Sequence, residues 1–94
     1  MEIYEGYKLS FIALGNSMTK YQWRLLSAVA IEGKVYQPTG KEFISKFQLG
    51  TSASVLRALN YLTERELAYQ YSDDKEKNFY EIYDIVLMRW LQKK

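Results

Sequence analysis

The chain has 94 residues, of which 48% are hydrophobic and 16% are aromatic, and its formal net charge is +2. This length predicts one domain with a modest core, and the composition excludes a disordered tail, which lacks the apolar surface needed to offset chain entropy. The sequence contains no His and no Cys, which excludes disulfides, thiolate zinc sites and His-dependent catalytic triads.

The beginning of the sequence carries no sign of export. The sequence begins Met-Glu-Ile, with an acidic residue at position 2, and it lacks a basic region followed by an apolar stretch. We therefore expect no signal peptide. The longest apolar runs, such as residues 85–88, are far shorter than the roughly 20 residues of a membrane span. We therefore expect a soluble, cytoplasmic module with no membrane partner, although the small net charge names no partner class.

The first element is expected to be short. Residues 8–14 are rich in apolar side chains and precede a Gly-Asn-Ser sequence at 15–17, which predicts a short helix that ends there. We treat residues 1–16 as an N-terminal linker or short helix, and residues 17–94 as the main domain.

A longer helix is predicted over residues 20–32. Thr19 and Gln22 have the spacing of a capping box, in which each side chain satisfies a backbone donor of the first turn. Gly33 occupies the position where a helix commonly ends in a left-handed residue. One helical face is apolar and comprises Trp23, Leu26, Val29 and Ala30.

Two more helices follow. Thr39 and Glu42 repeat the capping-box spacing and predict a short helix over 40–47. Thr51 and Ser52 can cap a third helix over 51–65. Its buried face follows helical spacing and comprises Val55, Ala58, Leu59 and Leu62.

The period then changes from helix to strand. Residues 67–71 and 79–83 are rich in β-forming side chains and are separated by a polar turn at 72–78, which predicts a β-hairpin. Asp84 can then cap a last helix, which runs through Leu91.

This order of elements predicts a winged helix-turn-helix. The fold class is α+β and mainly α, with about four helices and a two-stranded hairpin as the wing. The tight turn at residues 48–51 contains Gly50, where a left-handed conformation is often needed.

Several short sequences carry a family resemblance. They are GKVYQPT at 33–39, EFI at 42–44, SASV at 52–55 with Ala58-Leu59, and Tyr83-Asp84 followed by Arg89-Trp90-Leu91. Over residues 17–92 the chain resembles the C-terminal winged-helix domain of prokaryotic, archaeal-type AAA P-loop ATPases. The resemblance implies a nucleotide site in a separate N-terminal domain. Because these 94 residues contain no Walker motif, it also implies a fragment or free-standing relative that needs no cofactor and has no ATP chemistry of its own.

The predicted third helix supplies candidate contacts to double-stranded DNA. The face opposite its apolar side carries Arg57, which can pair with a guanine edge, and Asn60, which can pair with an adenine edge. Thr51, Ser52 and the first amides of the helix can accept a phosphate, although these two residues are first of all helix caps.

Four lysines are candidate contacts to the DNA backbone. Lys41 and Lys46 lie on the short helix before the turn, and Lys75 and Lys77 lie in the wing. However, residues 66–84 hold six carboxylates against those two wing lysines, a net charge of −4. Because phosphate neutralisation dominates DNA affinity, the acidic wing argues against DNA contact there.

The alternative function is protein interaction. Leu56 and Tyr61 flank the outer face of the third helix, where polar or basic side chains would suit DNA better. These two residues could dock the domain on its own ATPase domain or on another protein partner.

No catalytic or metal site is expected. Asp73 and Asp74 lie in a turn with nothing to hold them across a substrate, and Ser52 and Ser54 have no His or Lys base at a defined spacing. The tyrosines of the hairpin could stack nucleic-acid bases, but cross-strand packing over a small core is the commoner role. They are Tyr69, Tyr71, Tyr80 and Tyr83.

Overall fold

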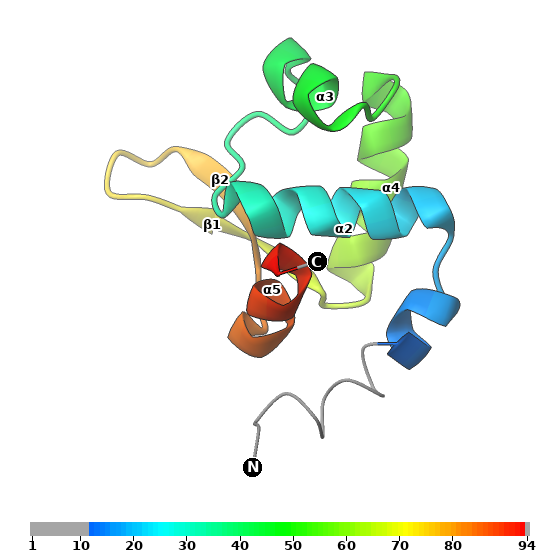
Figure 1. The fold of residues 1–94 in the computed structure, drawn as a ribbon. Helices are drawn as coiled ribbons and strands as arrows, with labels where there is room; N and C mark the ends of the chain where they lie inside the picture. Colours follow the sequence, from blue (N-terminus) through cyan, green and yellow to red (C-terminus); the bar gives the residue numbers. More distant parts are fainter. Residues whose placement is uncertain (1–11, 94) are drawn as a thin grey trace.

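The computed structural model describes residues 12–93 (Figure 1). Residues 12–16 are helical. The elements that follow are α2 (Lys20–Glu32), α3 (Lys41–Phe47), α4 (Ser52–Glu64), β1 (Ala68–Ser72), β2 (Asn78–Ile82) and α5 (Ile85–Gln92). The predicted order of three helices, a hairpin and a last helix is confirmed.

Helix α2 is the centre of the structure. It contacts α3, α4, α5 and β2, and in Figure 1 it crosses the middle of the molecule while the hairpin projects to one side. The core around α2 is aliphatic, and burial of such side chains supplies the main favourable term in folding. The largest fully buried side chains are Leu25, Leu26, Val29, Leu49, Val55, Leu59, Leu62 and Leu91.

The predicted ends of α2 are confirmed. The Thr19 hydroxyl accepts from the Gln22 backbone N–H at 3.0 Å, and the Gln22 side chain accepts from the Thr19 N–H at 3.0 Å. At the other end Gly33 has φ +86°, and its N–H donates to the Val29 carbonyl at 2.9 Å. Sequence and geometry therefore agree at both ends of the central helix.

The predicted cap of α3 is wrong. The N-cap is Gly40 rather than Thr39, and no side chain caps this helix. The Gly40 N–H donates to the Gln37 carbonyl at 3.0 Å, so a turn over 37–40 carries the chain one residue further before the helix begins. Glu42 in the first turn still favours the helix through its dipole.

The predicted helix over 8–14 lies partly outside the described residues, and its observed end is two residues later than predicted. The helix continues through Asn16, and it ends where the Ser17 hydroxyl donates to the Leu14 carbonyl at 2.7 Å. Gly15 lies inside the helix, over the ring of Trp23, where a Cβ would make ordinary contact at 3.5 Å. There is therefore room for a Cβ atom at position 15, so the packing does not require glycine there.

The hairpin is antiparallel, with Ala68 opposite Ile82 and Ser72 opposite Asn78. Both strands therefore meet the prediction to within one residue. Val35 adds an isolated bridge to β2, because it exchanges two backbone hydrogen bonds with Tyr80 at 2.8 and 2.9 Å. This bridge fixes the base of the hairpin to the segment that follows α2.

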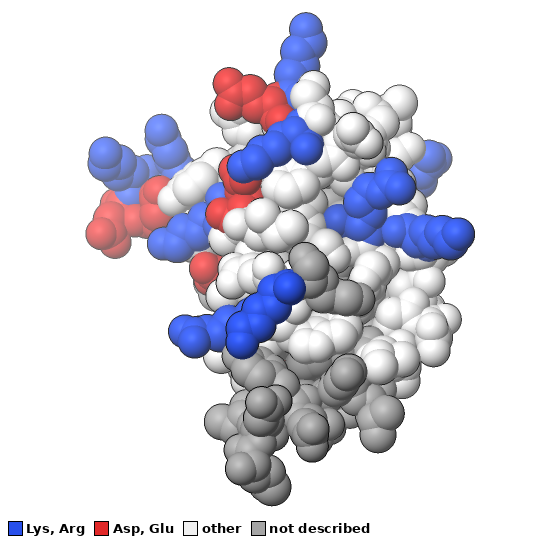
Figure 2. All heavy atoms as spheres, in the orientation of Figure 1, with Lys and Arg blue, Asp and Glu red and all other residues white. Residues whose placement is uncertain are grey.

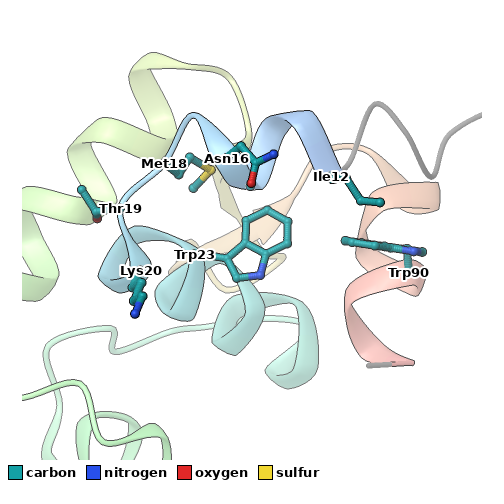
Figure 3. A pocket seen from close by; sticks show the side chains of 8 residues that line it. Ile12, Asn16, Met18, Thr19, Lys20, Trp23 and Trp90 are labelled. Atoms are coloured by element: carbon teal, nitrogen blue, oxygen red, sulfur yellow. The ribbon is translucent and has the colours of Figure 1, made fainter.

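Helix α5 closes the structure against α2. The Asp84 carboxylate accepts from the backbone N–H groups of Val86 and Leu87, as predicted for the cap. The Gln92 side chain donates to the Ala30 carbonyl at 2.7 Å. Trp23 and Trp90 meet edge to face with ring centroids 6.0 Å apart, and Figure 3 shows both indoles lining the hollow beneath residues 12–16.

Candidate nucleic-acid interface

The tight turn between α3 and α4 is held by α2. Leu49 is fully buried, and its carbonyl accepts a 2.6 Å hydrogen bond from the Tyr21 hydroxyl. Gly50 has φ +82°, as predicted for this turn. Gln48 also adopts the left-handed conformation, at φ 54°, and its carbonyl accepts from Arg24 at 3.4 Å. The strain of a non-glycine left-handed residue is thus offset by contacts from α2.

Helix α4 is oriented by its apolar side. Val55, Leu59 and Leu62 are buried, which turns the opposite face to solvent. The residues exposed on that face are Ala53, Leu56, Arg57, Asn60 and Glu64. The structure therefore places Arg57 and Asn60 side by side on one exposed helix face, one helical turn apart.

Thr51 has a structural role at the start of α4. Its hydroxyl accepts from the Ser54 backbone N–H at 3.2 Å and donates to the Ser54 hydroxyl at 3.0 Å. Ser52 is exposed as the first residue of the helix. Of the two residues predicted as caps, Thr51 is the N-cap that holds the first turn.

Arg57 of α4 and Arg24 of α2 both act electrostatically on Tyr21. Burial raises the pKa of the Tyr21 hydroxyl, while the positive charges of Arg24 and Arg57 oppose that rise. Both guanidinium groups therefore lie near the same hydroxyl, although 33 residues separate them. A hollow of about 220 Å³ lies between the first turns of α2 and α4, and its lining includes Thr19, Ser54 and Arg57.

We name the exposed surface formed by Lys20, Arg24 and Arg57 the basic face. The two helices that carry it have acidic residues only at their last positions, Glu32 and Glu64. Residues 12–31 and 52–63 contain no Asp or Glu. Figure 2 shows basic side chains without acidic ones in the region where α2 begins, whereas both signs are mixed over the hairpin. Lys20 and Arg24 were absent from the sequence prediction. The absence of acids from residues 12–31 was the signal that could have found them.

The lysines of α3 lie among acidic side chains. The Lys46 ammonium forms an ion pair with Glu32 at 2.9 Å and lies 5.4 Å from the centroid of the Phe47 ring. Lys41 is exposed and lines a groove that also contains Glu32 and Glu42. These two predicted backbone contacts are thus partly neutralised by their neighbours.

The wing lysines lie at a turn built by a carboxylate. The Asp73 side chain accepts from the backbone N–H groups of Lys77 and Lys75, each at 2.9 Å, and the Tyr36 hydroxyl also donates to it. These hydrogen bonds lower the pKa of Asp73, although partial burial opposes them. The lysine side chains are exposed beside Asp74 and Glu76, so the tip of the wing remains acidic.

The two residues of the predicted protein interface differ in exposure. Leu56 is 49% exposed on α4. Tyr61 is half-buried against the core, and the Arg65 guanidinium lies 4.9 Å from its ring centroid. Tyr61 therefore offers a partner less of its side chain than Leu56 does, because the core and Arg65 cover part of its ring.

Within residues 12–93, no group of three or more His, Cys, Asp or Glu side chains is arranged to hold a metal ion. Over the same residues, no helix combines the length and the apolar character needed to cross a membrane.

The comparisons with known proteins give one match. A family model described as a probable winged helix domain matches residues 9–93. Neither the curated proteins nor the solved structures contain a significant match to this chain.

Proposed function

This chain belongs to the family of probable winged helix domains, and from that premise we propose that it binds double-stranded DNA through α4. Winged helix domains are DNA- or protein-binding modules, and the choice between the two rests on the surface. The observation that carries the choice is the basic face, which unites Lys20, Arg24 and Arg57 on two helices whose only acidic residues lie at their last positions (Figure 2). Such a patch next to an exposed helix is the electrostatic footprint expected of duplex recognition.

In this proposal the exposed side chains of α4 contact bases, while those of α2 contact phosphates. Arg57 and Asn60 reach base edges in the major groove, where guanine and adenine present matching acceptors and donors. Lys20 and Arg24 contact phosphates on the flank, and Thr51 keeps the first turn of α4 in place.

The wing has a minor role in the proposed complex. Residues 66–84 carry a net charge of −4, so their approach to phosphates would be unfavourable. We therefore place the duplex against α2 and α4, with the acidic hairpin directed away from the phosphate backbone.

Salt dependence of duplex binding tests the proposal. Fluorescence anisotropy of a labelled random-sequence duplex is measured at about 50 mM and about 200 mM salt. The two phosphate contacts assigned to Lys20 and Arg24 predict a slope of about −1.8 in log affinity against log salt, which is roughly a 12-fold loss over this range. Equal affinities at the two salt concentrations, or no binding at either, would overturn the proposal.

The alternative of a protein interface makes the opposite prediction. Leu56 is a large apolar side chain exposed in the centre of the same helix face, and apolar anchors of this kind dominate protein interfaces. Under this alternative Leu56→Asp abolishes association with the partner and the association is insensitive to salt. Under the DNA proposal Arg57→Ala weakens duplex binding.

The resemblance to archaeal-type AAA ATPases supports one finer proposal, that this module serves a P-loop ATPase. Its support is the set of sequences GKVYQPT, EFI, SASV and YD…RWL quoted above. Reading the gene that encodes this chain, together with its neighbours, tests the idea directly. A Walker motif upstream in the same frame or in an adjacent gene is expected, and its absence from both would contradict the proposal.

A further inference from the structure

The outer side of the hairpin carries a continuous row of aromatic rings. By register Tyr69, Tyr71 and Phe79 share this side, because Tyr71 is opposite Phe79 and Tyr69 is opposite Glu81. The row continues at both ends, since Tyr36 lies 5.4 Å from Phe79 and Tyr83 lies 4.8 Å from Tyr69 between ring centroids. We name these five residues the aromatic face.

Most of the aromatic face is not part of the main core. Phe79 is buried, but it packs outside the core cluster, between Tyr36 and Tyr71. Tyr36, Tyr71 and Tyr83 are 44%, 38% and 66% exposed. These tyrosines therefore present ring surface to solvent instead of filling the interior of the domain.

Carboxylates surround the exposed rings. Glu81 is directly opposite Tyr69 in the sheet, and Asp84 follows Tyr83. Burial raises the pKa of the Tyr69 hydroxyl, and the nearby Glu66 carboxylate raises it further. Glu66, Tyr69, Tyr83 and Asp84 line a single cleft of about 460 Å³ beside α5. Arg65 also lines the cleft, with its guanidinium 4.9 Å from the Tyr61 ring centroid. The cleft thus combines two aromatic rings with two carboxylates and one guanidinium, and its local net charge is −1.

One cation already uses this surface. The Lys34 ammonium lies 5.1 Å from the centroid of Phe79, within the range in which a cation is attracted to the face of an aromatic ring. We propose that the aromatic face, at the Tyr69–Tyr83 cleft, binds an arginine- or lysine-rich segment of a partner protein. Charge complementarity selects this occupant, because the same carboxylates repel the phosphates of a nucleic acid.

A titration with a defined peptide tests the proposal. The probe is a short peptide of alternating arginine and glycine, added to the isotope-labelled domain while backbone amide shifts are recorded by NMR at about 50 mM salt, where surface charges are weakly screened. We expect shifts at Tyr69, Glu81 and Tyr83. A protein of net charge +2 has no general attraction for a cationic peptide, so a local response reports the cleft.

Three variants test whether the aromatic ring of Tyr83 and the charge of Glu66 contribute to peptide binding. Tyr83→Phe keeps the ring and retains affinity, whereas Tyr83→Leu removes the π face and weakens binding about threefold to fivefold, as expected of an exposed cation–π contact. Glu66→Gln weakens binding, while the control Glu42→Gln on α3 does not. Equal affinity of the Phe and Leu variants, or shifts confined to other elements, would overturn the proposal.

A single-stranded DNA titration separates this inference from the proposed duplex binding. Shifts at Tyr69 and Tyr83 on adding an oligothymidine would favour base stacking over cation binding and overturn the proposal. Loss of duplex binding leaves the peptide result unaffected, because the basic face and the aromatic face share no residue.

Discussion

The basic face and the aromatic face lie in regions of opposite charge, although the net charge of the whole domain is small. The basic face joins Lys20, Arg24 and Arg57 from two helices that carry acidic residues only at their last positions. The aromatic face lies on the hairpin segment 66–84, which has a net charge of −4. A net charge of +2 for the whole chain therefore describes neither surface. Partner chemistry must be read from each face separately.

Charge reversal on the basic face has the largest expected effect. In Arg24→Glu with Arg57→Glu, two favourable contacts become repulsive, so duplex affinity falls by at least about 100-fold. Anisotropy titration measures the loss, and circular dichroism checks that the fold is retained. Arg89→Glu on α5 is the matched control, because Arg89 is exposed on a different helix. If the control loses as much affinity as the double variant, the basic face is not the binding surface.

Removing the Tyr21 hydroxyl tests how the basic face is supported. In Tyr21→Phe the Leu49 carbonyl loses its 2.6 Å hydrogen bond at a buried turn residue. We expect the free energy of unfolding to fall by about 1–2 kcal/mol, measured by urea denaturation. The peptide response of the aromatic face should not change. An unchanged unfolding midpoint would mean that α2 does not hold the turn through this hydroxyl.

Truncation of the N-cap of α4 has a smaller effect. Thr51→Ala removes the acceptor of the Ser54 N–H, which should cost about 1 kcal/mol of stability. Thr51→Ser keeps the hydroxyl and should stay close to the parent. If Thr51 also contacts a phosphate, the Ala variant loses duplex affinity while the Ser variant does not. Equal stability of the Ala and Ser variants would contradict the capping role.

Lowering the pH should weaken the turn at the tip of the wing while leaving the basic face unchanged. The pKa of Asp73 is lowered from its ordinary value of 3.8, chiefly by the Lys77 and Lys75 backbone N–H donors. The stabilisation is therefore present above this value and is lost as the pH falls through the lower pKa of the folded state. The Lys75 and Lys77 amide shifts should move in that acid range, and in Asp73→Asn this movement should disappear. Its persistence in the variant would assign the change to another carboxyl group.

Sequence reasoning succeeded where the determinants are local. The capping box of Thr19 and Gln22 and the Asp84 cap depend on residues within one helical turn, and both were predicted. The hairpin strands follow from β-forming side chains on either side of a polar turn. The cap of α3 was missed because the turn over 37–40, and not the Thr39 side chain, sets where that helix begins.

The surfaces were harder to predict because tertiary structure assembles them. Arg24 and Arg57 are 33 residues apart in sequence, yet where burial raises the pKa of the Tyr21 hydroxyl, the positive charges of both arginines oppose that rise. Tyr61 has the spacing of a flank residue, yet the core and Arg65 cover part of its ring. Likewise, Tyr36 lies outside the hairpin in sequence but donates a hydrogen bond to Asp73 at its tip. Periodicity identifies a helix face, but it does not say which distant side chains share it.

The segment after α2 gives the hairpin two attachments. Val35 pairs with Tyr80 near the base, and Tyr36 contacts Phe79 and Asp73 further out. A wing fastened at two points is a rigid arm instead of a hinged flap. The hairpin should therefore keep a fixed orientation relative to α2 when a partner binds either surface.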